Sequence, residues 1–120
     1  MRVLVCGDRN WRDMGAIERE LKKLPIDTII IHGAAKGTDI LAKFVAEKIG
    51  LKVINDGKGF PAEWKRYGKG AGPIRNQQML DEGKPDLVLA FHENISESRG
   101  TKDMVNRARG AGVKVEIFKK

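Results

Sequence analysis

Short runs of apolar residues, rich in β-branched side chains, recur along this chain at regular intervals. The runs are continuous rather than alternating, which is typical of strands buried on both faces of a parallel sheet. They lie at residues 3–6, 28–31, 53–54, 87–90 and 113–118. The pattern therefore predicts five short strands.

The segments between these runs carry apolar residues at helical spacing. The first segment shows it through Ile17, Leu21 and Leu24, and the second through an i, i+4 stripe from residue 40 to residue 49. A third helix is expected from Pro73, a residue favoured in a first turn, to a stop at Gly83. A fourth is expected from about residue 100 to residue 110, before a glycine-rich breaker.

Alternating strands and helices with right-handed crossovers predict a three-layer α/β fold that is Rossmann-like. We expect a mainly parallel five-stranded sheet with helices on both faces, formed by residues 1–120 as a single domain. The stretch from residue 55 to residue 72 contains five glycines and is interpreted as a long irregular loop beside the site.

Composition narrows the class of protein but does not choose a function. The chain has 120 residues, of which 41% are hydrophobic and 32% charged. No apolar run is long enough for a membrane span or a signal peptide, and Cys6 has no internal disulfide partner, so we expect a cytoplasmic protein with no membrane contact. The formal charge of +7 favours an anionic partner.

In an open α/β sheet the ligand lies at the carboxyl ends of the strands, where helix N-termini converge. Three segments after predicted strands or at predicted helix starts carry suitable residues. Gly33, Ala34 and Gly37 allow backbone amides to approach an anion, and Asp39 can cap the next helix or hold a ribose hydroxyl. An ordinary strand-to-helix turn is the alternative interpretation of that loop.

The second segment is Arg99, Gly100 and Thr101, which place a guanidinium, a glycine and a hydroxyl at another helix start. The third is the helix start at residues 71–76, where Arg75 can grip a phosphate and Asn76 can bind a ribose or a base edge. A solvated surface arginine is the alternative there.

Other side chains are weaker candidates. His32 is a possible ribose contact, although a lone histidine at a strand end is more often structural. Trp11 and Trp64 are candidates for stacking on a base, and we favour Trp64 because an aromatic residue directly after a strand more often closes the core. Two distant histidines and one cysteine predict neither a metal site nor a cofactor.

Five motifs resemble the small YspA-type members of the SLOG superfamily, stand-alone domains of bacteria and phages. The motifs lie, in order, at residues 3–11, 31–39, 60–65, 71–77 and 99–104. The superfamily joins the single-stranded-DNA-binding domain of DNA-processing protein A, the "lonely guy" phosphoribohydrolases and sensors of ADP-ribose derivatives. The resemblance implies a Rossmann-like fold that binds a nucleotide or a relative of one, and it suggests a homodimer.

The resemblance also assigns roles by position. Gly7 and Arg9 are expected to line the crevice, and Gly33, Gly37 and Asp39 to form one wall. Arg75 with Asn76 are expected to hold a phosphate or ribose, and Gly100 with Thr101 to form the phosphate-binding turn.

The phosphoribohydrolases carry a glutamate three positions after the threonine, and this chain has Met104 there. Asp103 is the only candidate catalytic residue that remains nearby. We therefore expect a binding protein for a phosphorylated nucleoside or nucleotide-derived signal, ADP-ribose-like or cyclic, that acts as a sensor or sequestering module. The alternatives are an N-glycosidase for a nucleoside monophosphate or NAD-like substrate, and single-stranded DNA binding.

Overall fold

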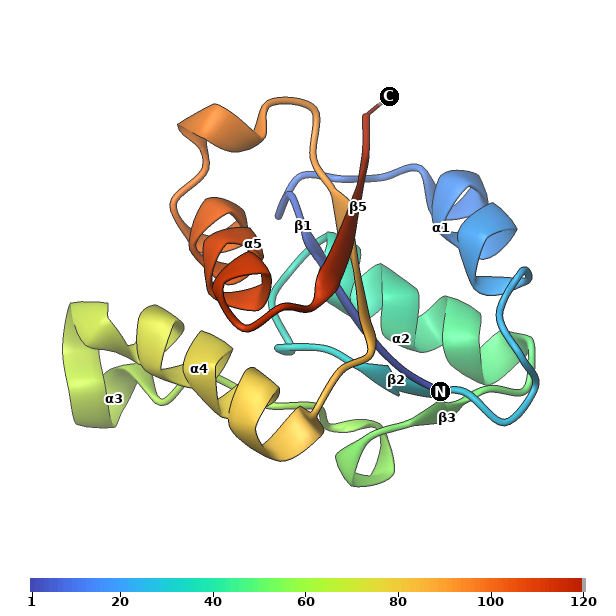
Figure 1. Ribbon diagram of the computed structural model, residues 1–120, viewed down its shortest axis with the longest axis horizontal. Coiled ribbons are helices and arrows are strands. Elements are labelled where there is room, and N and C mark those ends of the chain that lie inside the picture. Colours follow the sequence, from blue (N-terminus) through green and yellow to red (C-terminus); the bar gives the residue numbers. More distant parts are fainter. Residues whose placement is uncertain (120) are drawn as a thin grey trace.

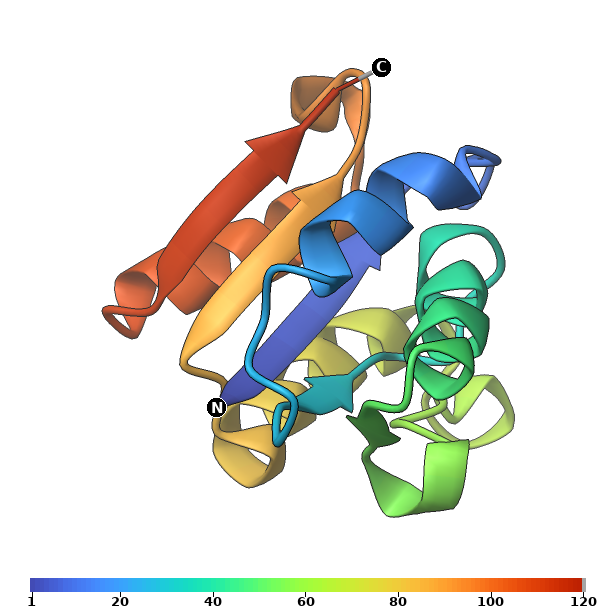
Figure 2. The same cartoon turned by 90° about the vertical axis from the view of Figure 1, so that its right-hand side faces the viewer.

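The computed structural model describes residues 1–119 and contains one parallel sheet of five strands in the order β3-β2-β1-β4-β5. All five strands run in the same direction (Figure 2). Their bounds are β1 Arg2–Gly7, β2 Ile29–Ile31, β3 Lys52–Val53, β4 Leu87–Phe91 and β5 Lys114–Phe118. The α/β class predicted from the apolar runs is therefore confirmed.

Helices cover both faces of the sheet (Figure 1). Helices α1 (Met14–Leu21) and α2 (Thr38–Lys48) pack on one face, and α4 (Ala71–Gly83) and α5 (Gly100–Gly110) on the other. Strand β1 shows why both faces are apolar. Val3 and Val5 belong to the core under α1 and α2, whereas Leu4 and Cys6 point into the core under α4 and α5.

The segment between β3 and α4 is more regular than predicted. It contains a 3-10 turn η1 (Asn55–Gly57), a four-residue helix α3 (Trp64–Tyr67) and a second 3-10 turn η2 (Gly68–Gly70). Helix α4 begins two residues before Pro73, which is compatible with that proline because first-turn N–H groups need no helical acceptor. It ends at Gly83 as expected, and Lys84 follows it in the left-handed conformation.

The strand order creates the crevice. Strands β2 and β3 follow β1 on one side of it in the sheet, and β4 and β5 lie on the other side. The loops after β1 and β4 therefore leave the sheet toward opposite faces, and a gap opens between them at the carboxyl ends of the strands. No helix within residues 1–119 is long and apolar enough to cross a membrane.

Candidate functional site

A cleft of about 930 Å³ lies at this end of the sheet. It is lined by the loops after β1, β2 and β4 and by the first turns of α4 and α5. Among residues 1–119, no three His, Cys, Asp or Glu side chains are grouped to hold a metal ion.

The loop after β1 is fixed tightly to its neighbours. Asp8 donates its N–H to the Phe91 carbonyl at 2.8 Å, and its own carbonyl accepts the N–H of Thr38 at 3.1 Å and the Thr38 hydroxyl at 3.0 Å. A β-carbon on Gly7 would collide with the Phe91 carbonyl oxygen. Only glycine therefore allows β1 and β4 to end this close together, with Arg9 exposed at the rim of the cleft.

The glycine loop after β2 uses its own amides internally. The N–H of Gly33 donates to the Asp39 carboxylate at 2.8 Å, and the N–H of Ala34 donates to His32 Nδ1 at 2.9 Å. The Ala35 amide also bonds to Asp39. These amides are therefore not free to cradle an anion, although Ala34 and Asp39 do line the cleft.

His32 holds the next turn in place. Because Nδ1 accepts the Ala34 N–H, the ring proton lies on Nε2, which donates to the Gly57 carbonyl at 3.0 Å. The ring is 1% exposed, and burial lowers the pKa of His32 despite that hydrogen bond to Gly57. A neutral histidine therefore ties η1 to the end of β2.

Arg75 projects from α4 beneath the same loop. Its Nη1 donates to the carbonyl of Gly33 and, at 3.4 Å, to that of Phe60, and its Nε donates to Asn76 Oδ1 at 3.1 Å. The side chain is half-buried and lines the cleft. Its Nη2 has no acceptor among the residues that the structure describes, so one edge of the guanidinium remains available.

The cleft lining contains three ionisable side chains whose charges interact, the buried Cys6 and Asp39 and the half-buried Arg75. Asp39 is 5% exposed, and burial raises its pKa to about 6 although the charge of Arg75 and the Gly33 and Ala35 amides favour the carboxylate. Burial also raises the pKa of the Cys6 thiol, and the charge on Asp39 adds to that effect. Burial lowers the pKa of Arg75, and the negative charge of Asp39 opposes that effect. Cys6 is therefore a protonated thiol at neutral pH, not a nucleophile.

The start of α5 forms the opposite wall. Ser98 Oγ accepts the N–H of Thr101 at 3.0 Å, which fixes the first turn of the helix. The N–H of Gly100 finds no acceptor within the described chain, and Arg99 beside it is exposed. This helix start therefore offers a free amide, a positive dipole end and a guanidinium to an anion.

A polar network connects α4 to α5 at the cleft. Asn76 Nδ2 donates to Asp103 Oδ2 at 2.9 Å and to the Gly100 carbonyl at 3.3 Å. Arg107 Nε donates to the same Asp103 oxygen at 2.8 Å, and its Nη1 donates to Gln77 Oε1 at 3.0 Å. The network holds the two helix starts, and the groups they carry, in a fixed relation.

The structure brings most of the sequence-predicted site residues into this one cleft. Its lining includes Gly7, Arg9, Ala34, Asp39, Trp64, Arg75, Asn76, Arg99, Gly100, Thr101 and Asp103.

Four of the proposed residues do not line it. Trp11 is 3% exposed and packs edge-on against Phe91, with ring centroids 5.6 Å apart. His32 and Gly33 are buried at the start of the loop after β2. Gly37 has a positive φ of 77° directly before α2 and lies against the backbone of Arg9. These four residues therefore support the loops of the site and do not face the cleft.

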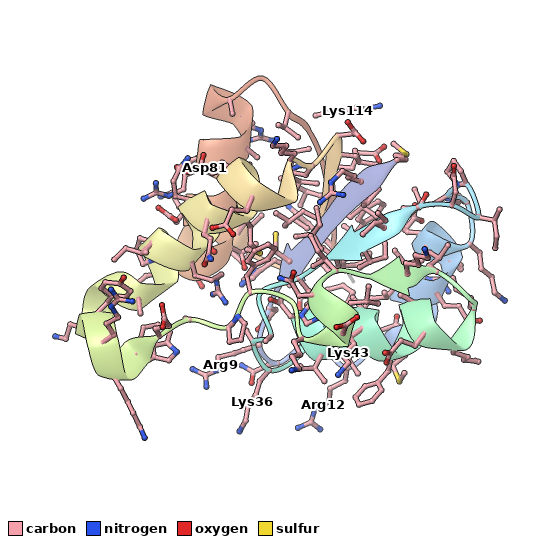
Figure 3. The ribbon with its side chains drawn as sticks, turned by 90° about the horizontal axis from the view of Figure 1, so that it is seen from below. Arg9, Arg12, Lys36, Lys43, Asp81 and Lys114 are labelled. Carbon is pink, nitrogen blue, oxygen red and sulfur yellow. The ribbon has the colours of Figure 1, made fainter. Side chains whose placement is uncertain are left out.

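Two basic residues of the cleft were not singled out from the sequence. Lys36 lies in the loop after β2, and Lys69 lies in η2. Figure 3 shows Arg9 and Lys36 extending outward from the strand-end loops, away from the sheet. Lys69 stands between two glycines and Lys36 directly precedes one, a pattern that would have marked them as flexible loop cations.

Comparison with known proteins agrees with the motifs. The model of the YspA, cpYpsA-related SLOG family matches residues 1–67, which run from β1 through α3. The Gene 61 protein of Mycobacterium phage D29 is 34% identical over 122 residues, which cover 98% of this chain and 95% of that protein. The chain therefore belongs to the YspA, cpYpsA-related SLOG family.

Proposed function

We propose that this cleft binds a phosphorylated nucleoside or a nucleotide-derived signal, ADP-ribose-like or cyclic, and that the protein acts as a sensor or sequestering module. One observation carries the proposal: hydrogen-bond donors without acceptors meet in a single cleft. They are the free edge of Arg75 and the free amide of Gly100, with Arg99 beside them. This is the donor set that a phosphate group requires.

The charges of the cleft support an anionic ligand. Its basic side chains are Arg9, Lys36, Lys69, Arg75 and Arg99. Its acidic side chains are Asp8, Asp39 and Asp103, each of which already accepts a hydrogen bond from this chain. None of the five basic side chains forms a close ion pair within residues 1–119, although the charge of Arg75 interacts with that of Asp39. The lining therefore has surplus positive charge.

An aromatic surface and the size of the cleft support a nucleoside. Trp64 lines the cleft with 58% of its surface exposed, which leaves a ring face available for a base. A volume of about 930 Å³ is at the upper end of the range for small-molecule sites, and it accommodates a nucleotide with a second group attached.

The first experiment is thermal unfolding of the protein with AMP, cyclic AMP, NAD, ADP-ribose, cyclic ADP-ribose or a short single-stranded DNA, at low and moderate salt. A ligand at about one hundred times its Kd should add about 2.7 kcal/mol of stability, a shift of several degrees for a chain of this size. We expect a salt-resistant shift with one of the nucleotides. A shift with DNA alone, lost as salt rises, would instead favour the strand-binding alternative.

Met104 supports binding without turnover. It occupies the position of the glutamate of the phosphoribohydrolases, is 1% exposed and packs in the core under α4 and α5. We expect no free base when the protein is incubated with nucleoside monophosphates or NAD. Release of base that is lost in Asp103→Asn would favour the N-glycosidase alternative.

A further inference from the structure

We propose that Asp103 is the acceptor for ribose hydroxyl groups, so that the site takes ribonucleotides and discriminates against deoxyribonucleotides. The inference rests on the proposed function and names the sugar that this function requires. It comes from the arrangement of the Asp103 carboxylate between α4 and α5.

The two oxygens of that carboxylate have different surroundings. Oδ2 accepts from Asn76 Nδ2 at 2.9 Å and from Arg107 Nε at 2.8 Å. Oδ1 has no donor in the part of the chain that the structure describes. The Asp103 side chain is 30% exposed and lines the cleft, so this carboxylate is accessible to a ligand.

The chemistry of this oxygen selects the kind of group that can occupy it. A carboxylate accepts hydrogen bonds and donates none, so it repels phosphate oxygens and attracts hydroxyl donors. Arg9, Lys36 and Arg99 are exposed cations of the cleft that favour phosphate. Asp8 is the other cleft carboxylate that is not buried, and it accepts the N–H of Asn10 within the loop after β1. Asp103 therefore marks the part of the cleft that suits a sugar, and the vicinal hydroxyls of a ribose supply the donors.

The carboxylate is held in place before any ligand arrives. Asn76 is 4% exposed, accepts from Arg75 Nε through its Oδ1 and bonds to the Gly100 carbonyl as well as to Asp103. Arg107 is in turn fixed by Gln77 Oε1 at 3.0 Å. A preorganised acceptor loses little side-chain entropy on binding, which favours its use in recognition.

Its distance from the phosphate donors also fits a nucleotide. Asp103 lies three residues after Gly100 on α5, which is about 4.5 Å along a helix axis at 1.5 Å per residue, and on the same side of the helix. In α4, Arg75 and Asn76 are adjacent and hydrogen-bonded to each other. A donor for a phosphate and the acceptor for the neighbouring ribose therefore lie side by side on α5, and Asn76 connects that acceptor to Arg75 on α4.

The test compares the four ribonucleoside 5′-monophosphates with their 2′-deoxy counterparts by calorimetric titration. For the wild-type protein we expect the ribonucleotide to bind about 10- to 100-fold more tightly, the range for one hydrogen bond to a charged group. Asp103→Ala should reduce this ratio to about one. Asp103→Asn keeps the shape of the side chain and should give an intermediate ratio.

Two further variants separate recognition from folding. Arg107→Gln should also lower the ratio, because Arg107 positions the carboxylate through its Oδ2 atom. Asp27→Asn, at an exposed aspartate before β2 and hence at the opposite end of the sheet, is the matched control and should leave the ratio unchanged. Thermal unfolding without ligand shows whether each variant is folded, and if Asp103→Ala is not, Asp103→Asn and Arg107→Gln carry the comparison.

The outcomes separate this inference from the proposed function. Nucleotide binding with equal affinities for ribose and deoxyribose, or a ratio that survives Asp103→Ala, would overturn the role of Asp103 and leave the nucleotide site standing. Absence of binding by every nucleotide, mononucleotide or larger, would overturn both.

Discussion

The guanidinium of Arg75 lies against the α-carbon of Gly33, in the space that a β-carbon at position 33 would need. A β-carbon built there meets the Nη1, Cζ and Nε atoms of Arg75 inside normal contact distances. The same Nη1 donates to the Gly33 carbonyl. The glycine and the arginine therefore form one unit, although they are 42 residues apart.

Gly33→Ala should displace Arg75 and weaken ligand binding. Gly33 does not have a positive φ, so the backbone tolerates alanine and the cost comes from the contact with the guanidinium. We expect a loss of about 1–3 kcal/mol of stability in urea unfolding, the usual range for overpacking. Gly110→Ala is the matched control, because a β-carbon there meets nothing within 4 Å.

A double-mutant cycle tests the cause of that loss. If the contact with Arg75 is responsible, Gly33→Ala should cost less than about 0.5 kcal/mol in an Arg75→Ala background, so that the two substitutions are strongly non-additive. Additive losses would show that position 33 requires glycine for another reason.

Arg75→Lys should separate the charge of Arg75 from its geometry. Lysine keeps the positive charge but lacks the planar fork that reaches the Gly33 carbonyl and presents a free edge to the ligand. We expect Arg75→Ala to weaken binding of the nucleotide identified by thermal unfolding by about 1.5–3 kcal/mol, and Arg75→Lys to recover less than half of this. Equal affinity of Arg75→Lys and the wild type in calorimetry would mean that only the charge matters.

Asp39 should make stability depend on pH. Its pKa rises from the ordinary 3.8 to about 6 in the folded protein, so the folded state binds the proton more tightly than the unfolded chain. The resulting stabilisation is complete below about pH 4 and is lost as the pH rises through 6, a change of roughly 3 kcal/mol. Asp39→Asn removes this change.

The measurement is urea unfolding of wild type and Asp39→Asn between pH 4 and pH 7.5. Burial lowers the pKa of His32, so its contribution has the opposite sign and is lost as the pH falls below about 6.5. Because His32 is present in both proteins, only the difference between them isolates Asp39. We expect the variant to gain stability relative to wild type as the pH rises, and a constant difference would contradict the raised pKa.

Trp64 should report ligand binding by fluorescence, and Trp11 should not. Trp64 is 58% exposed at the cleft, whereas Trp11 is 3% exposed in the core. A base stacked on Trp64 should quench its emission, and Trp64→Ala should weaken binding by about 1–3 kcal/mol. The quenching should persist in Trp11→Phe and vanish in Trp64→Phe; the reverse pattern would place the base elsewhere.

The strands and the four predicted helices could be located from the sequence because each has a strong local signal. The continuous run Leu87–Phe91 is buried along its whole length in β4, and the proline and glycine around α4 marked its ends within two residues. Helix α3 was missed because four residues, Trp64–Tyr67, are too few to show a helical period.

The local sequence does not show which polar groups of the site are left without a hydrogen-bond partner in the folded chain. The loop after β2 has the composition of a phosphate loop, but Asp39, two residues after Gly37, folds back and accepts the Gly33 amide. The pairing of Asn76 with Asp103 spans 27 residues and exists only because α4 packs beside α5. Such pairings depend on the tertiary arrangement and produce no recognisable pattern in the sequence.

The division of the cleft between two parts of the chain has a consequence for its assembly. Residues 1–67 supply one wall with Arg9, Lys36 and Trp64, whereas Arg75, Asn76, Gly100 and Asp103 come from the helices that follow. Neither part contains the cleft by itself. The cleft therefore exists only after α4 and α5 have packed beside the loops that follow β1 and β2.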